Sequence, residues 1–264
     1  MSDYLFLCNV GSGIRNHISL TNFAPNHIGQ IPKEKNFKCA VFKQNFQSTK
    51  WKKIDEKYFS SHNLYFSSDE YSLDIGELAV IVPVSIEDNL KAEYDELPIP
   101  ISRKIDLSPV NERASITFSI HDFHSSYQGD FPYSMSRIHG TFLSFDPLIQ
   151  NRRCNQKLVF VNIHSKKIDN KRNLKIFTAA IDKNKILATK EFVNNSAAIF
   201  DFEGIKDRDL CFYSRDALGI PIFISFNEKE FISVEHTHPP SELFWENKMF
   251  GQGLIKKNWL NKLP

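Results

Sequence analysis

The residues best suited to chemistry lie in the segment SVEHTHPPSELFW, residues 233–245. His236 and His238 alternate there, Glu235 precedes them, and Glu242 follows four residues after His238. Side chains two positions apart on a strand point to the same face, so both imidazoles can reach one ion. Neutral imidazole suits zinc, iron, nickel or copper, and a carboxylate completes the ligand set. The alternative is a strand end whose histidines form hydrogen bonds before the proline pair stops the strand.

Two families resemble this segment over a short stretch. The spacing His-x-His-x3-Glu is similar to the first metal motif of cupins, and HTHP is similar to the signature of JAMM metalloproteases. Cupins place a glycine six residues before the first histidine, where this chain has Glu230, and a second histidine motif downstream. JAMM proteases complete their zinc site with a serine and an aspartate beyond the histidines, and residues 245–264 contain no aspartate. The chain is therefore assigned to neither family.

A second concentration of polar and aromatic groups lies in FSIHDFHSSYQGDFPYSMSRIHG, residues 118–140. A polar, aromatic loop on a β scaffold is where binding residues tend to lie. Tyrosine and arginine supply stacking faces and forked donors that suit sugars, phosphates or carboxylates. The candidates for substrate binding are Tyr127, Asp130, Tyr133 and His139, and those for catalysis are His121, Asp122 and Arg137. The alternative is a surface loop whose polar side chains satisfy one another.

The two segments form one site only if they meet in the fold. His236 and His238, together with His124 or His121, would then make a three-histidine site for a divalent transition metal, zinc or iron. Such a site with an open position lowers the pKa of bound water toward about 7 and generates hydroxide. The hypothesis is a His-rich, metal-dependent cleft formed by residues 121–139 and 235–242.

Carboxylates near the histidines of both segments are candidates for the ligand-orienting and general-base roles. Asp122, Glu235 or Glu242 would orient a metal ligand or act as a general base. A metal-free version of the site uses one histidine as the general base and Arg137 to hold an anionic group.

The elements that must position these groups are mostly strands. Phenylalanine is abundant, at 23 of 264 residues, and aromatic residues pack well on pleated sheets. From Leu158 onward, apolar runs alternate with turn-forming clusters: LVFVNI, LKIFTAAI, KILATKEFV, AAIFDF, LCFY, IPIFISF and EFISV. This pattern predicts a mainly β fold with an antiparallel sandwich or barrel-like sheets.

The N-terminal half has strand candidates at YLFLCNV, KCAVFKQNF, NLYFSS and ELAVIVPVS, the last buried on both faces. We expect a short helix over 86–96. A proline-rich connector then divides an N-terminal lobe, 1–105, from a C-terminal β domain, 106–264; a crossing within one domain is the alternative. PPSELFWENKMFG predicts a short C-terminal helix with Ser241 as its N-cap. No internal repeat is visible in the sequence.

The glycines of CNVGSGIRN invite comparison with a dinucleotide-binding loop. Gly11 and Gly13 follow a predicted strand, but Asn16 stands where the third glycine belongs. The βαβ context and the later acidic residue are missing as well. The pattern therefore predicts a tight turn.

Net charge, apolar runs and cysteine spacing limit the kinds of molecule that the chain is expected to bind. The formal net charge is +2, and the basic residues around the predicted turns after residue 150 lack interleaved aromatics, which disfavours nucleic acid. No apolar run is long enough for a membrane span, and four scattered cysteines without a CxxC pair indicate free thiols. We expect a cytoplasmic protein whose ligand is a small or carbohydrate-like molecule.

Two functions follow from these observations. The first is an enzyme of the hydrolase or lyase type, which requires a concave pocket where the two histidine segments converge within metal or hydrogen-bond reach. The second is a β-sandwich interaction protein with structural histidines, which requires a flat aromatic patch and histidines that point apart.

Overall fold

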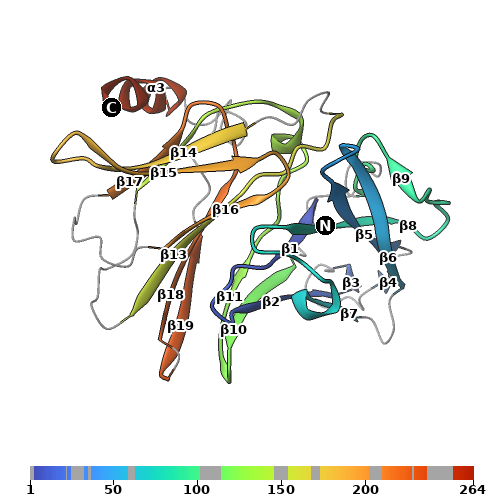
Figure 1. Cartoon of the computed structure of the whole chain (residues 1–264). Coiled ribbons are helices and arrows are strands. Elements are labelled where there is room, and N and C mark those ends of the chain that lie inside the picture. Colours follow the sequence, from blue (N-terminus) through green and yellow to red (C-terminus); the bar gives the residue numbers. More distant parts are fainter. Residues whose placement is uncertain are drawn as a thin grey trace. The chain divides into compact units, whose positions relative to one another are not determined.

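A computed structural model gives the fold as two compact units (Figure 1). Unit 1 comprises Met1–Ser136 and Ser165–Lys171, and unit 2 comprises Arg137–His164 and Arg172–Pro264. The boundary expected at 105/106 falls within residues 102–113, which the structure does not describe. The described residues are 3–21, 23–24, 33–34, 37–58, 63–101, 114–145, 154–167, 173–201, 210–227, 229–236 and 252–264.

Unit 1 contains two antiparallel sheets. The first has the strand order β1 (Leu5–Cys8), β8 (Leu78–Ser85), β5 (Phe37–Asn45), β6 (Lys50–Tyr58) and β9 (Glu93–Tyr94). The second has the order β11 (Phe123–Gln128), β10 (Ser115–Ile120), β2 (Arg15–Thr21) and β7 (Asn63–Ser67). A two-residue pair, β3 (Phe23–Ala24) with β4 (Lys33–Glu34), and the 3-10 turns η1 (Ser68–Glu70) and η2 (Met135–Arg137) complete the elements assigned up to Arg137.

Side-chain alternation explains the layering of unit 1. Strand β8 is buried along almost its whole length, as its continuous apolar run predicts. In the second sheet, by contrast, Ile18, Leu20 and Phe118 are buried on one face. Most polar residues of the same strands lie on the other face, where Ser19 is exposed, while Asn16 is buried on the core side. One face of this sheet therefore packs in the core, and the other carries most of its polar side chains.

Unit 2 is built from two four-stranded antiparallel sheets. One has the order β12 (Phe142–Phe145), β17 (Leu210–Ser214), β14 (Asn173–Ala180) and β15 (Lys185–Val193). The other has the order β16 (Ala197–Asp201), β13 (Asn155–Val161), β18 (Ile220–Asn227) and β19 (Phe231–His236). One core cluster joins side chains from both sheets, so the sheets form a sandwich.

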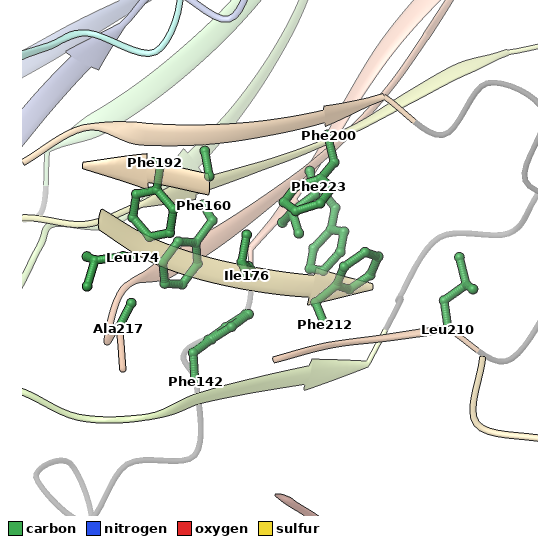
Figure 2. Close-up of a cluster of buried hydrophobic side chains, with 12 residues drawn as sticks. Phe142, Phe160, Leu174, Ile176, Phe192, Phe200, Leu210, Phe212, Ala217 and Phe223 are labelled. Atoms are coloured by element: carbon green, nitrogen blue, oxygen red, sulfur yellow. The ribbon is translucent and has the colours of Figure 1, made fainter. Parts of the chain in front are cut away.

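Aromatic rings fill the space between these two sheets, as Figure 2 shows. Phe142 and Phe160 have ring centroids 4.5 Å apart, and Phe212 and Phe223 have centroids 5.6 Å apart. Such tilted pairs are more favourable than face-to-face stacking. The abundance of phenylalanine in the sequence therefore has a structural use in this core.

The helix α3 (Gln252–Lys262) covers the outer face of the β12-β17-β14-β15 sheet. Leu260 and Leu263 pack against Leu143, Cys211 and Tyr213. Strand β17 is thus buried on both faces, which explains why its LCFY carries no exposed residue.

The two units share one strand connectivity. If β3, β4 and β9 are set aside, each unit has eight strands in the described residues, numbered first to eighth along the chain. In both units the sheet orders are then 1-6-3-4 and 8-7-2-5, and every pairing is antiparallel. The sequence does not reveal this repetition.

The hairpin between the third and fourth strands repeats in finer detail. The β5–β6 and β14–β15 hairpins each contain one register shift, after Val41 and after Thr178. Both close through a four-residue turn, 46–49 and 181–184, whose last residue has a positive φ, +57° in Thr49 and +46° in Asn184. Left-handed backbone at the same turn position is uncommon outside glycine, so the agreement is specific.

The structure confirms the predicted mainly β, antiparallel fold, and its sheets are open sandwich layers. The helix expected over 86–96 is wrong: this stretch contains a turn and the short strand β9, and Tyr94 pairs with Trp51 on β6. Two further interactions hold the stretch in place, since Ala92 O accepts from Lys53 N and the Tyr94 ring lies 5.6 Å from that of Phe42. Tertiary pairing therefore overrides the local helix propensity.

A short C-terminal helix is present, at Gln252–Lys262. The proposed N-cap Ser241 and the helix expected before Gly251 lie outside the described residues. None of the four cysteines forms a disulfide. Among the described residues, no helix is both long and apolar enough to span a bilayer.

Candidate functional site

The predicted metal-dependent cleft draws on residues from both units. His124 belongs to unit 1, and Glu235, which is exposed, lies next to the end of β19 in unit 2. His236 is the last residue of β19, but its side chain is not described, and His238 and Glu242 lie outside the described residues. A metal centre formed by His124, His236 and His238 therefore stays a prediction.

His121 and Asp122 form the turn of a hairpin. Residues 118–128, read from the sequence as part of a polar loop over 118–140, belong to the antiparallel strands β10 and β11 and their turn instead. Both turn residues are exposed, and His121 has a φ of +50°, a left-handed conformation that histidine adopts more readily than most residues. The predicted catalytic pair is thus presented at the tip of a rigid hairpin.

The predicted substrate-binding residues of unit 1 contact the N-terminal segment. The backbone amide of Asp3 donates to Asp130 Oδ2 over 2.6 Å, and the amide of Tyr133 donates to Asp3 Oδ2 over 2.8 Å. The Tyr127 ring stacks on Phe118 and is buried, and burial raises the pKa of its hydroxyl. These contacts fix the segment after β11 against the start of the chain, and substrate binding by these residues stays a prediction.

Arg137 and His139 belong to unit 2. Arg137 ends η2, and the exposed His139 ring stacks on the buried ring of His164 at 4.6 Å between centroids. A neighbouring network holds His164 in place, because its backbone amide donates to Asn195 Oδ1. Their proposed roles in catalysis and substrate binding are likewise predictions.

Unit 1 has a hollow of about 430 Å³ at one end of its sheets. Three connections line it: the turn between β1 and β2, the segment after β7, and the β10–β11 turn. The lining residues are Asn9, Gly13, Ile14, Arg15, Ser68, Asp69, Leu73 and His121.

The β1–β2 turn that borders the hollow is the expected tight turn at GSG. Gly11, Ser12 and Gly13 have φ values of +71°, +55° and +67°. Asn9 organises this turn, because its Oδ1 accepts from the amide of Gly11 over 3.0 Å and its Nδ2 donates to the carbonyl of Leu73 over 2.8 Å. The Asn9 side chain thereby ties two walls of the hollow together.

The guanidinium of Arg15, the carboxylate of Asp69 and the imidazole of His121 line the hollow. Arg15 Nη1 lies 3.3 Å from Asp69 Oδ2, and both side chains are more than half exposed. The neighbouring Ser68 Oγ accepts from the backbone amide of Asn16 over 3.2 Å. An arginine, a histidine and a hydroxyl around one hollow suit a ligand with a phosphate or carboxylate group.

A second group of polar residues lies on the outer face of the β11-β10-β2-β7 sheet. The His17 ring is 5.2 Å from the Tyr65 ring and 6.5 Å from the His124 ring. Burial and, to a smaller degree, the charge of His124 lower the pKa of His17. Thr117 on β10 pairs with both His17 and Ser126, and the two hydroxyl oxygens of Thr117 and Ser126 are 2.7 Å apart.

Within the described part of the chain, no group of three or more histidine, cysteine or acidic side chains is arranged to hold a metal ion. No known family model matches the chain, and no curated protein has a significantly similar sequence. The site is therefore interpreted from its own geometry.

Of the residues proposed from the sequence, only His121 lines the hollow, and Arg15, Asp69, Ser68 and Asn9 were missed. The glycine turn was the one signal in the sequence that pointed to this end of the sheets. The contribution of the η1 segment depends on the pairing of β2 with β7, which no local pattern reveals.

Proposed function

We propose that the chain is an enzyme of the hydrolase or lyase type that binds a small anionic or carbohydrate-like molecule in the hollow of unit 1. The observation that carries the proposal is the convergence of His121, Arg15, Asp69 and Ser68 on one hollow of about 430 Å³. Small-molecule sites are typically concave, about 300–1,000 Å³ in volume, with a few convergent polar groups. A flat aromatic patch, expected of an interaction protein, does not describe this end of unit 1.

Each polar group in the hollow has a distinct role in the proposed reaction. Arg15 binds the anionic group of the ligand, since a guanidinium matches phosphate or carboxylate geometry. Asp69 positions Arg15 through their ion pair. His121 acts as the general base or acid, because the ordinary pKa of imidazole lies near neutrality.

Binding and turnover can be tested separately. Thermal unfolding of the full chain would be followed with inorganic phosphate, a hexose phosphate and a dicarboxylate, and hydrolysis with chromogenic phosphate and carboxylate esters. We expect Arg15→Ala to abolish stabilisation by the anion, and His121→Ala to keep that stabilisation while lowering turnover about 10²- to 10⁴-fold, the usual contribution of a general base.

The matched control is Lys52→Ala, which removes an exposed cation of unit 1 that does not line the hollow. If Lys52→Ala and Arg15→Ala reduce anion binding equally, or if His121→Ala leaves every activity unchanged, the assignment of the hollow as the active site is wrong.

An interaction protein is the second candidate, and one observation favours it. Ile75 is 70% exposed, and its side chain borders Gly11 in the turn beside the hollow. A contiguous exposed apolar patch rimmed by polar residues is typical of protein interfaces, and Ile75 would belong to such a patch. In that case Ile75→Asp would abolish association with a partner while His121→Ala would leave it intact, as measured by analytical ultracentrifugation.

The metal-dependent cleft of residues 121–139 and 235–242 is a separate proposal, with zinc or iron as cofactor. Elemental mass spectrometry of the purified chain, beside His236→Ala/His238→Ala, tests it: near-stoichiometric metal that the variant loses without unfolding is the expected result. A cytoplasmic location is proposed as well, supported by the buried thiols of Cys8, Cys39 and Cys211.

A further inference from the structure

We propose that His17 and His124 form a binding site for a divalent transition metal on the outer face of the β11-β10-β2-β7 sheet. The proposal is independent of the hollow, since neither His17 nor His124 lines it. It shares His124 with the predicted cleft but replaces His236 and His238 by His17, which was not a candidate residue.

The strand register brings the two rings together. Strand β10 lies between β2 and β11, and it pairs Thr117 with His17 and Ser119 with His124. The two histidines therefore project from neighbouring rows of the same sheet face. Their ring centroids are 6.5 Å apart with an interplanar angle of 74°.

Coordination of one ion requires the exposed His124 side chain to turn toward His17. Because each metal–nitrogen bond is about 2.0–2.1 Å long, two imidazoles on one metal have ring centres about 5 Å apart in tetrahedral positions and about 6.5 Å apart only when they lie opposite each other. The observed 6.5 Å is therefore the upper limit for a shared ion. His17 is more restrained, because Tyr65 flanks it at 5.2 Å on its other side.

The groups around His17 and His124 are compatible with a bound cation. The nearest polar neighbours are hydroxyls, those of Thr117, Ser119 and Ser126, which can hold metal-bound water. Arg15 is the positive group on this face, and Asp69 pairs with it at 3.3 Å. The remaining coordination positions of the ion face solvent and would be filled by water.

The chemistry of the ligands selects the metal. Imidazole suits Cu²⁺, Ni²⁺ and Zn²⁺, with Cu²⁺ the tightest in the usual affinity order. Ca²⁺ and Mg²⁺ require oxygen ligands and would not compete. The site is thus a two-nitrogen site with exchangeable water positions.

The test uses the untagged full chain carrying His236→Ala and His238→Ala, which removes the other predicted histidine pair. Isothermal titration with Cu²⁺, Ni²⁺ and Zn²⁺ should show one equivalent bound. His17→Gln or His124→Gln should each weaken binding at least about tenfold, since loss of even an outer-shell partner of a metal costs 10–100-fold. The double substitution should weaken it little further once one ligand is lost.

His121→Gln is the matched control, because it removes a histidine from the same hairpin and leaves the pair intact. The electron paramagnetic resonance spectrum of bound Cu²⁺ should show coupling to two imidazole nitrogens. The proposal is overturned if the parent chain binds no Cu²⁺, Ni²⁺ or Zn²⁺, or if His121→Gln weakens binding as much as His124→Gln. Should His17→Gln impair folding, the exposed His124→Gln decides alone.

Discussion

The guanidinium of Arg215 donates a hydrogen bond to the carbonyl oxygen of Leu263 over 3.0 Å. The same side chain donates to the carbonyls of Leu260, at 3.0 Å, and Pro264, at 3.2 Å. These carbonyls belong to the last turn of α3 and the residues after it, where the helix has no backbone N–H group left to donate to them. A cation there also complements the negative end of the helix dipole. Arg215, directly after β17, therefore fastens the helix to the sheet.

Removal of the Arg215 hydrogen bonds should weaken the attachment of α3 to the sheet. We expect Arg215→Ala to lower the free energy of unfolding by about 1 kcal/mol, at the low end for charge-assisted bonds because Arg215 is exposed. Urea unfolding, followed by tryptophan fluorescence, measures the effect. Lys262→Ala removes another cation of the same turn and should change stability by much less; equal effects of the two substitutions would contradict the assignment.

Gly219 is the least replaceable glycine whose surroundings are described. A Cβ at this position would lie 2.3 Å from the carbonyl oxygen of Val161 and 2.6 Å from Phe160 Cζ. We expect Gly219→Ala to destabilise unit 2 by about 2–3 kcal/mol or more, since overpacking against backbone cannot relax easily. Thermal unfolding tests it. Gly140→Ala, whose Cβ would meet only the Leu218 side chain at 3.3 Å, should cost far less.

Asn162 links three segments of unit 2 from a buried position. Its Nδ2 donates to the carbonyl of Leu218 over 2.8 Å, and its Oδ1 accepts from the amide of Asn195 over 3.2 Å. Asn162→Asp exchanges the donor for a second acceptor that faces a carbonyl. We expect a loss of about 1–3 kcal/mol at neutral pH, measured by chemical denaturation. Asn173→Asp, at an exposed strand start, is the control.

Glu56 gives unit 1 a stability that depends on pH. Burial acts to raise the pKa of Glu56, but hydrogen bonds from Lys38, Lys53 and Tyr58 lower it to about 2, from a usual value of 4.5. A carboxyl whose pKa is lowered on folding stabilises the folded state above its unfolded pKa, and this contribution disappears as pH falls from about 4.5 to about 2. The loss should be steeper in the parent chain than in Glu56→Gln.

Unfolding midpoints measured between pH 7 and pH 2 test this prediction. Glu93→Gln serves as the control, because its partner Lys50 lies 3.9 Å away at an exposed site. Parallel pH profiles for the parent chain and Glu56→Gln would show that the ion-pair network contributes no pH-dependent stability.

The apolar strands were predictable and the polar ones were not. KILATKEFV coincides with β15, and ELAVIVPVS contains β8. Strands β6 and β10–β11 were missed because lysines, histidines and serines occupy their outer faces, and those residues read locally as solvated loop. Period-two alternation identifies a strand only when its two faces differ clearly in polarity.

The candidate site was predictable only at one residue. His121 was singled out by its chemistry, but its neighbours Arg15 and Asp69 are distant in sequence and meet it only after β2 has paired with both β10 and β7. No local sequence pattern specifies how β2 pairs with β10 and β7. The His17–His124 pair depends on the same pairing, since β10 separates the two strands that carry it.

The shared connectivity of the two units has an evolutionary meaning. Duplication and fusion of one gene would produce eight strands in each unit, the same two sheet orders and matching third-to-fourth hairpins. In unit 1 the connections after the first, fifth and seventh strands form the hollow. Their counterparts in unit 2 are the connections β12–β13, β16–β17 and β18–β19. Duplication would leave each half free to diverge in these connections while its sheets keep one strand order.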